Sequence, residues 1–160
     1  MIVISIPGRP TLHLEHLVLD VSGTLALDGN LSSGVAERLA SLRRDLTVNL
    51  LTADTHGGQE EVDRSLNLKA TILPPTMPAV TQQALKGAYV SQLGASTVVA
   101  IGNGSNDALM LSKAALGIAV VGPEGLAVQA LTAADVVCAS INDALDLLLF
   151  PDRLRATLRI

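Results

Sequence analysis

Six short runs of aliphatic residues alternate with segments of amphipathic spacing, and this alternation constrains the fold of the chain more than any other feature. The runs are continuously apolar, which is typical of strands buried on both faces of a parallel sheet. They span residues 16–20, 46–52, 69–73, 97–102, 116–121 and 134–138. We therefore predict an α/β fold: a three-layer sandwich around a doubly wound, mostly parallel sheet, with residues 1–160 forming a single domain.

Helical spacing fills the intervals between these runs. Several of the intervening segments open with Ser, Asn or Pro-Glu, which are helix start signals. The predicted helices span residues 32–44, 56–67, 81–94, 105–114, 123–133, 141–150 and 151–160. A further apolar run at residues 1–6 is interpreted as an extra edge strand, with a turn over residues 7–10.

Charge and the scarcity of aromatic residues exclude several classes of function. Aromatic residues make up 1% of the chain, and 11 basic residues against 15 acidic ones give a net charge of −4. Base stacking and a basic nucleic-acid surface are therefore not available. The single cysteine excludes an internal disulfide, and no segment has the length of a membrane span or the pattern of a signal peptide. We expect a cytoplasmic protein that binds neither nucleic acid nor membrane.

Polar clusters follow three of the predicted strands, at residues 20–24, 52–55 and 102–107. The carboxyl ends of parallel strands meet at one edge of the sheet, where open α/β sheets bind their ligands. We therefore expect the three clusters to converge. The last of them, Gly-Asn-Gly-Ser-Asn-Asp, lacks the spacing of a dinucleotide-binding loop and follows a late strand, which disfavours a Rossmann dinucleotide site.

Asp20 ends a buried run, and two interpretations of it are open. It is either a strand-terminal residue that caps a turn or a nucleophile that attacks phosphorus. Phosphoryl transfer needs hydrogen-bond donors, a positive charge and oxygen ligands for a metal ion. Thr52, Lys86, Asn103 and Asp107 are the candidates for these roles.

The order of these residues resembles the four motifs of the haloacid dehalogenase-like (HAD) phosphotransferase superfamily. D-V-S-G-T-L at 20–25 is followed by a strand ending in Thr52, a lysine, and G-N-G-S-N-D-A-L at 102–109. The likeness covers about residues 17–138 and is strongest to the phosphorylation domain of P-type ATPases and to the free-standing soluble P-type ATPase group. It implies a HAD-like Rossmannoid fold and a magnesium-dependent phosphohydrolase or phosphotransferase that works through an aspartyl-phosphate on Asp20.

The resemblance also implies a role for each matching residue. The implied catalytic residues are Asp20, Ser22, Thr52 and Lys86. The implied ligands of the phosphorylated substrate are Thr52, Ala53 and Lys86. The implied magnesium ligands are Asp20, the backbone carbonyl of Ser22, Asn103 and Asp107. Lys69 is the alternative to Lys86, but it begins a predicted strand and would lie at the opposite end of the sheet.

Two residues depart from the pattern that the resemblance implies. Ser22 stands where phosphatases of this superfamily carry a general acid, and serine cannot perform acid–base chemistry near neutral pH. Asn103 stands where a metal-binding aspartate is usual, and an amide brings no negative charge. The chain is therefore either a slow phosphatase or a non-catalytic, regulatory protein that binds a phosphorylated ligand or a protein partner.

The spacing of the motifs predicts a capless protein. No insertion of cap size separates Asp20 from Thr52 or Thr52 from Lys86, and residues 25–30 would form at most a small hairpin over the site, with its turn at 28–30. A capless member takes large phosphorylated substrates or uses a neighbouring subunit as its lid, so we expect a homo-oligomer. The membrane helices of the pumps are absent, and ion pumping is not expected.

Several other polar residues lie near the predicted strands. His13 and His16 would face opposite sides of a strand and are interpreted as ordinary strand residues. Asp54 is interpreted as a helix cap, and His56 is a candidate for the border of the pocket. Asp135 either supports the geometry of the site or merely starts a strand.

Overall fold

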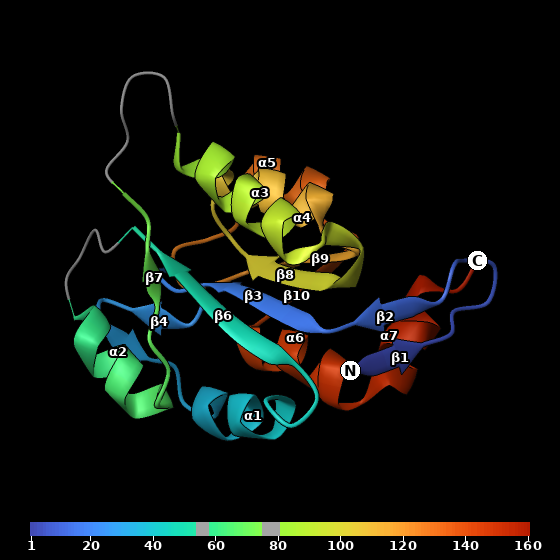
Figure 1. Cartoon of the computed structure of the whole chain (residues 1–160), viewed down its shortest axis with the longest axis horizontal. Coiled ribbons are helices and arrows are strands. Elements are labelled where there is room, and N and C mark those ends of the chain that lie inside the picture. The colour runs from blue at the N-terminus through green and yellow to red at the C-terminus, as the bar shows by residue number, and fades with distance from the viewer. Residues whose placement is uncertain (54–57, 75–80) are drawn as a thin grey trace.

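A six-stranded sheet forms the centre of the molecule. The computed structural model describes residues 1–53, 58–74 and 81–160. The strands lie in the order β10-β9-β8-β3-β6-β7, and each neighbouring pair is parallel (Figure 1). Their bounds are β3 His16–Asp20, β6 Thr47–Thr52, β7 Thr71–Ile72, β8 Val98–Gly102, β9 Leu116–Val120 and β10 Val136–Cys138. The prediction of an α/β fold with a mostly parallel sheet is confirmed.

The chain fills this sheet outward from β3 in two directions. It runs through β6 to β7, returns to β8 on the other side of β3, and continues through β9 to β10. Because the crossovers of parallel strands are right-handed, this reversal sends the connecting helices to opposite faces. The point of reversal lies between β3 and β8, where sheets of this topology open a crevice beyond the strand ends.

Helices cover both faces of the sheet, as the predicted three-layer sandwich requires (Figure 1). One layer contains α3, α4 and α5, and the other contains α1, α2, α6 and α7. Their bounds are α1 Val35–Leu42, α2 Gln59–Leu66, α3 Gln82–Leu93, α4 Ala108–Lys113, α5 Val128–Ala133, α6 Ile141–Leu149 and α7 Pro151–Leu158. The helix predicted over 123–133 is shorter than expected, because a turn at 122–125 precedes it.

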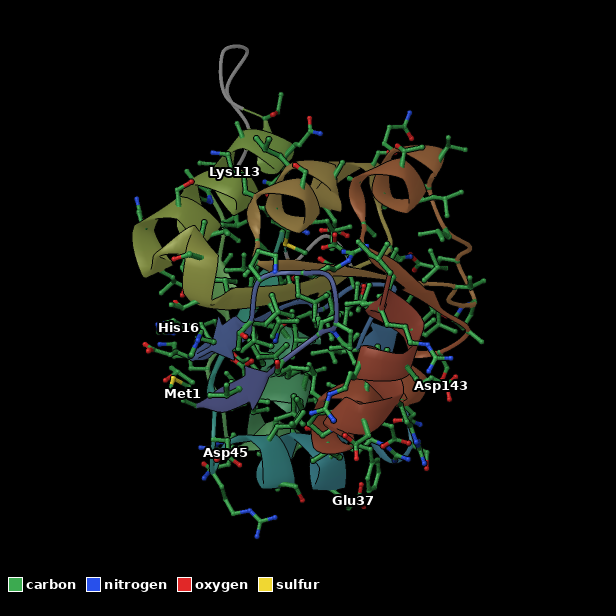
Figure 2. The ribbon with its side chains drawn as sticks, turned by 90° about the vertical axis from the view of Figure 1, so that its right-hand side faces the viewer. Met1, His16, Glu37, Asp45, Lys113 and Asp143 are labelled. Carbon is green, nitrogen blue, oxygen red and sulfur yellow. The ribbon has the colours of Figure 1, made fainter. Side chains whose placement is uncertain are left out.

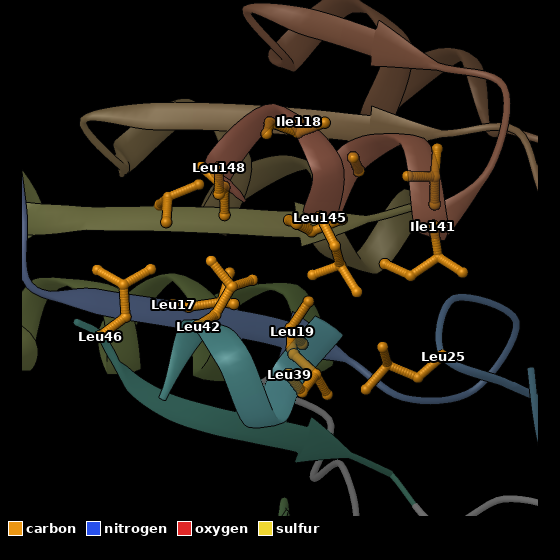
Figure 3. Close-up of a cluster of buried hydrophobic side chains, with 14 of the residues drawn as sticks. Leu17, Leu19, Leu25, Leu39, Leu42, Leu46, Ile118, Ile141, Leu145 and Leu148 are labelled. Atoms are coloured by element: carbon orange, nitrogen blue, oxygen red, sulfur yellow. The ribbon is translucent and has the colours of Figure 1, made fainter. Parts of the chain in front are cut away.

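Aliphatic side chains form the core on both faces of the sheet. On one face, Leu17 and Leu19 of β3 lie in one cluster with Leu39 of α1 and Leu145 of α6, and all four are fully or almost fully buried (Figure 3). On the other face, a second cluster includes Val18, Val90 and Met110. Because successive residues of β3 enter different clusters, this strand is buried on both sides, which agrees with its continuously apolar sequence.

Charged side chains lie on the outside of both helical layers. Figure 2 shows Lys113 at the layer of α4 and Glu37 at the layer of α1, and both are exposed. A helix that covers one face of a sheet needs only one apolar stripe, so its other face carries such residues. Within the described residues, no helix is long and apolar enough to cross a membrane.

The N-terminal segment forms a separate hairpin and not an edge strand of the main sheet. Residues 1–6 were predicted to add an edge strand to the main sheet, but β1 (Ile2–Ile4) pairs in antiparallel fashion with β2 (Leu12–Leu14) in a separate two-stranded sheet. The strand β2 was not foreseen, because its three residues adjoin the longer aliphatic run of β3. The buried Ile4 and Leu14 attach this hairpin to the core.

A second hairpin follows β3 directly, as predicted. The strands β4 (Ala26–Leu27) and β5 (Asn30–Leu31) pair around a two-residue turn at Asp28 and Gly29. Both turn residues have positive φ, 51° and 78°, which matches the twist of a tight hairpin. This short hairpin is the structured insertion between Asp20 and α1.

Candidate functional site

Asp20 lies at the sheet edge where the direction of the chain reverses. It is the last residue of β3, paired in register with Leu51 of β6, while the neighbouring β8 leads directly into Asn103. Only 5% of Asp20 is exposed, although the group is a carboxylate. A buried carboxylate requires charged or hydrogen-bonding partners.

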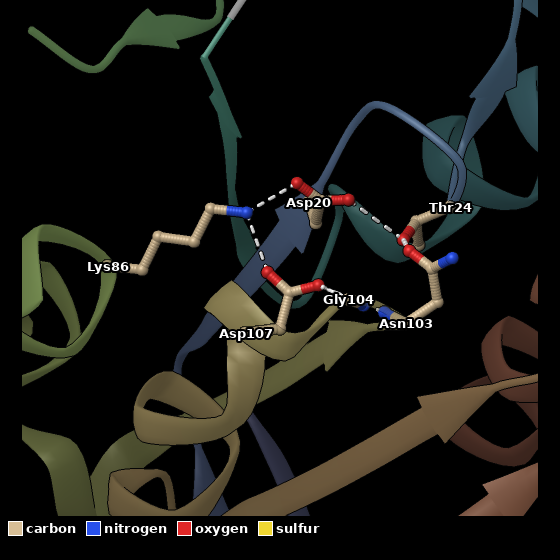
Figure 4. A network of polar contacts seen from close by, with 6 residues as sticks. All are labelled: Asp20, Thr24, Lys86, Asn103, Gly104 and Asp107. Atoms are coloured by element: carbon tan, nitrogen blue, oxygen red, sulfur yellow. Dashed lines mark hydrogen bonds and ion pairs between the residues drawn. The ribbon is translucent and has the colours of Figure 1, made fainter. Parts of the chain in front are cut away.

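Lys86 is the charged partner of Asp20. From α3 its Nζ lies 2.5 Å from Asp20 Oδ1 and 2.6 Å from Asp107 Oδ1, so that one ammonium joins two carboxylates (Figure 4). The residue is 1% exposed. A lysine on the helix before β8 therefore reaches the carboxyl edge of the sheet. By contrast, Lys69 lies two residues before β7 and borders a separate surface hollow with Glu60.

Asp107 is held in place by the backbone of the loop after β8. Its Oδ2 accepts hydrogen bonds from the N–H groups of Asn103, at 3.0 Å, and Gly104, at 2.8 Å. A Cβ at Gly102 would lie 2.6 Å from this carboxylate, so only glycine permits the approach. The Gly-Asn-Gly-Ser-Asn-Asp sequence thus positions Asp107, which leaves its Oδ1 to contact Lys86.

Thr24, which was not predicted as a site residue, joins an oxygen of Asp20 to an oxygen of Asn103. Its Oγ1 lies 3.0 Å from Asp20 Oδ2 and 3.0 Å from Asn103 Oδ1 (Figure 4). A hydroxyl has one hydrogen to donate, and the two acceptors therefore compete for it. Thr24 belongs to the motif at 20–25 and lies four residues after Asp20. This position is the signal that could have indicated its role.

The electrostatics of the site favour different protonation states for its acid and its base. Burial, together with the nearby Asp107 carboxylate, raises the pKa of Asp20 to about 7, against the opposing effects of Lys86 and Thr24. Burial alone would lower the pKa of Lys86, but the charges of Asp20 and Asp107 outweigh it and raise the pKa. Lys86 therefore remains an ammonium, while Asp20 is easily protonated until another cation arrives.

Two adjoining cavities open beside Asp20. The larger has a volume of about 190 Å³, and its lining contains Asp20, Ser22, Ala53, Lys86, Asn103, Gly104, Asn106 and Glu124. The smaller, of about 20 Å³, is bordered by the β4–β5 hairpin, the start of α2 and Thr52. Ser22 and Glu124 line both. Thr52 ends β6 beside Asp20 and is 1% exposed.

The oxygens at this edge fit a hard cation such as magnesium. Asp20 Oδ2 and Asn103 Oδ1 approach the same hydroxyl, which brings a carboxylate and an amide oxygen together, and oxygen donors of this kind suit Mg²⁺. Within the described residues, no group of three or more His, Cys, Asp or Glu side chains could hold a metal ion. The donor set is consequently poor in charge.

The other candidate residues do not belong to this group. His13 and His16 lie in β2 and β3, in different sheets, and His16 begins the strand that Asp20 ends. Asp135 binds the backbone N–H of Gly117 at 2.9 Å, near the start of β9, which supports its interpretation as a strand-start residue. Asp54 and His56 lie outside the described residues.

Comparison with known proteins gives the fold of the chain. No family model matches the sequence. A 62-residue stretch, 39% of this chain, is 53% identical to an uncharacterised protein of Methanocaldococcus jannaschii and covers 67% of it. The chain and this archaeal protein belong to one family.

Solved structures extend the likeness to nearly the whole chain. A Streptomyces avermitilis protein assigned to the HAD family hydrolases superposes with a TM-score of 0.68 and 21% identity over 92% of each chain. The chain has the haloacid dehalogenase-like fold. The 3-deoxy-D-manno-octulosonate 8-phosphate phosphatase of Moraxella catarrhalis, solved with magnesium and phosphate ions, gives 0.64 and 20%, over 92% of this chain and 94% of that one.

The likeness to P-type ATPases is also present in the structure. A zinc-transporting PIB-type ATPase in its E2.Pi state matches with a TM-score of 0.61 and 24% identity. The match covers 80% of this chain but only 20% of the ATPase, so a small part of the pump shares the HAD fold described above. At these identities the shared feature is the fold, which confirms the predicted resemblance to both groups.

Because the pKa of Asp20 is raised, we expect the free energy of unfolding to depend on pH in metal-free buffer. Between pH 4 and 7 the folded protein holds a proton on Asp20 that the unfolded chain has released, so the free energy of unfolding falls as pH rises through this window. Asp20→Asn removes the cost of the second carboxylate. We expect this variant to be more stable than wild type by on the order of 1–3 kcal/mol at pH 8, and by much less at pH 4.

Urea unfolding followed by circular dichroism measures this difference, since the chain contains no tryptophan. Asp45→Asn is the matched control, because Asp45 is exposed and the substitution should leave stability unchanged at both pH values. A variant at position 20 that is equally stable at both pH values relative to wild type, or less stable at pH 8, would contradict the account.

Proposed function

We propose that the chain is a magnesium-dependent phosphohydrolase or phosphotransferase that forms an aspartyl-phosphate on Asp20. The observation that carries this proposal is the buried Lys86 ammonium joining Asp20 and Asp107 at the switch point of the sheet. The fold is that of HAD hydrolases, and the Moraxella catarrhalis phosphatase of this fold was solved with magnesium and phosphate. A phosphorylated substrate would enter the cavity beside Asp20.

The first step is attack by an Asp20 carboxylate oxygen on phosphorus. A new O–P bond forms, the P–O bond to the leaving group breaks, and the leaving oxygen keeps the electron pair and takes a proton from solvent. Lys86 brings positive charge to both Asp20 and the incoming phosphoryl oxygens, while Thr52 and the backbone of Ala53 provide donors at the neighbouring strand end. Water then cleaves the acyl-phosphate, which releases phosphate and restores Asp20.

A bound magnesium ion would neutralise the phosphoryl oxygens and the Asp20 carboxylate. Asp20 Oδ2, Asn103 Oδ1 and the backbone carbonyl of Ser22 are the oxygens that would hold it, with Asp107 behind them. Such an ion would also compete with Thr24 for both side-chain oxygens. By opposing the effect of burial, its charge would keep Asp20 ionised at neutral pH.

Ser22 limits the rate in this proposal. It lines both cavities beside Asp20 and stands where an acid would protonate the leaving oxygen and later activate water. A hydroxyl performs neither task near neutral pH, and the loss of general acid–base catalysis costs about 10²–10⁴-fold in rate. Slow turnover and a long-lived acyl-phosphate follow.

A second candidate function is binding without catalysis. Ser22 and Asn103 both weaken the chemistry and leave the charged group of Asp20, Lys86 and Asp107 intact. Such a site would still hold a phosphorylated ligand. The substitutions below separate this regulatory function from slow hydrolysis.

The substrate proposal follows from the open site. Among the described residues, the β4–β5 hairpin and the start of α2 border the cavity beside Thr52, and the hairpin is too short to enclose a ligand. We propose that the protein takes large phosphorylated substrates or completes its site as a homo-oligomer in the cytoplasm.

Replacing Ser22 with an acid tests the catalytic function. Ser22→Asp should raise the hydrolysis of p-nitrophenyl phosphate, by up to about 10²–10⁴-fold, because the new carboxylic acid can protonate the leaving oxygen. Ser22→Asn introduces a side chain with the shape of aspartate but without its acid, and it should show no gain in hydrolysis. Adding Asp20→Asn to the Ser22→Asp background should abolish activity.

Two results would contradict catalysis through Asp20. If wild type and Ser22→Asp are both inert while either still binds a phosphorylated ligand, the binding function replaces the enzymatic one. A gain in Ser22→Asp that survives Asp20→Asn would remove Asp20 as the nucleophile.

Replacing Asn103 with aspartate tests the metal site. Asn103→Asp should bind magnesium more tightly, by about tenfold, because the added negative charge attracts the positive ion. It should also lose the hydrogen bond from Asn103 Nδ2 to the Gly125 carbonyl, of 3.2 Å, and so unfold more easily without metal. Titration calorimetry measures the affinity.

Asn106→Asp is the control for charge alone, because Asn106 lines the same cavity without reaching Asp20 or Thr24. It should raise the affinity less than Asn103→Asp. Equal or weaker magnesium binding by Asn103→Asp than by wild type would exclude Asn103 as a ligand.

A further inference from the structure

A tight turn after β9 carries a carboxylate to the edge of the site. Residues 122–125 form this turn, closed by a hydrogen bond of 2.8 Å from the Gly125 N–H to the Gly122 carbonyl, with Glu124 at its third position. Asn103 forms hydrogen bonds to the turn and to the segment just after it. The Asn103 side chain donates to the Gly125 carbonyl at 3.2 Å, and the Asn103 carbonyl accepts from the Ala127 N–H at 2.9 Å.

The carboxylate of Glu124 lies close to the loop that follows Asp20, at Gly23. A Cβ at Gly23 would lie 2.3 Å from Glu124 Oε2 and 3.2 Å from Asn103 Nδ2. The carboxylate and the side chain of Asn103 therefore lie over the same residue. Gly23 has a φ of 76°, a conformation that also favours glycine.

The carboxylate of Glu124 has no partner of its own. Among the described residues, none forms a hydrogen bond or an ion pair with it, and Glu124 lines both the large cavity with Asp20 and Asn103 and the small one with Thr52. The nearby Lys86 ammonium forms its ion pairs with Asp20 and Asp107. The carboxylates of Asp20 and Asp107 together exceed the charge of Lys86 by one, and the exposed Glu124 adds a second negative charge at the rim of the cavity.

We propose that Glu124 supplies to the bound metal ion the negative charge that Asn103 lacks. The inference rests on the proposed function, because it concerns the same magnesium ion. It explains why an amide is tolerated at position 103: there the amide anchors the turn through Gly125, and the turn presents the carboxylate. Carboxylates near a metal site typically change its affinity by 10–100-fold.

The test is the affinity for Mn²⁺, followed by the electron paramagnetic resonance signal of the free ion, with Mg²⁺ as competitor. Glu124→Gln keeps the size of the side chain and removes its charge, and it should weaken binding by about tenfold or more. Glu37→Gln, in the exposed face of α1, is the matched control and should bind as wild type does. Circular dichroism verifies that both variants are folded.

A double variant separates the effect of charge from the effect of structure. Asn103→Asp combined with Glu124→Gln restores one carboxylate to the site, and its affinity should return to within a fewfold of wild type. If Glu124 only maintained the turn, the double variant would remain as weak as Glu124→Gln.

The results distinguish this inference from the proposed function. Wild-type affinity in Glu124→Gln, with clear metal binding by wild type and weaker binding by Asp20→Asn, would overturn the role of Glu124 and leave the phosphatase proposal in place. No binding of either ion by wild type would overturn both.

Discussion

One lysine ammonium between two buried carboxylates is the interaction on which the site depends. Lys86 reaches Asp20 at 2.5 Å and Asp107 at 2.6 Å from a position that is almost fully enclosed. The arrangement has one positive charge for two negative ones. Burial and the negative charge of Asp107 together raise the pKa of Asp20. Such a group is costly for a fold and adds little as a structural ion pair. The proposed magnesium ion would bring the further positive charge that this group lacks.

The fold concentrates these charges because of the order in which it fills its sheet. β3 and β8 are distant in the chain and adjacent in the sheet, so the residues that follow them meet. The turn after β9 joins them through Asn103. Gly102 makes room for the carboxylate of Asp107, and Gly23 provides the positive φ of the loop beside Glu124. The site is therefore built from backbone approach as much as from charged side chains.

The sequence predicted the parts of this structure that depend on strand-end position. Continuous aliphatic runs indicated the parallel sheet, and the polar residues after them indicated Asp20, Thr52 and Asn103. The convergence of Lys86 on two carboxylates required the likeness to a known family, because a helix position alone does not tell which strand end its side chain reaches. Thr24 and Glu124 were missed for a similar reason: their contacts join segments that no local pattern connects. Pairing of β1 with β2 was missed because short strands carry little periodicity.

If Asp20 accepts a phosphoryl group, a crystal structure with magnesium and beryllium trifluoride will reveal it at this carboxylate. Beryllium trifluoride mimics a phosphoryl group bonded to a carboxylate. We expect beryllium bonded to an Asp20 carboxylate oxygen, fluorides within reach of Lys86 Nζ and Thr52, and the metal ion against Asp20 and Asn103. Beryllium trifluoride bound away from Asp20, or an unmodified Asp20 still paired with Lys86 under conditions that saturate the metal site, would contradict this expectation.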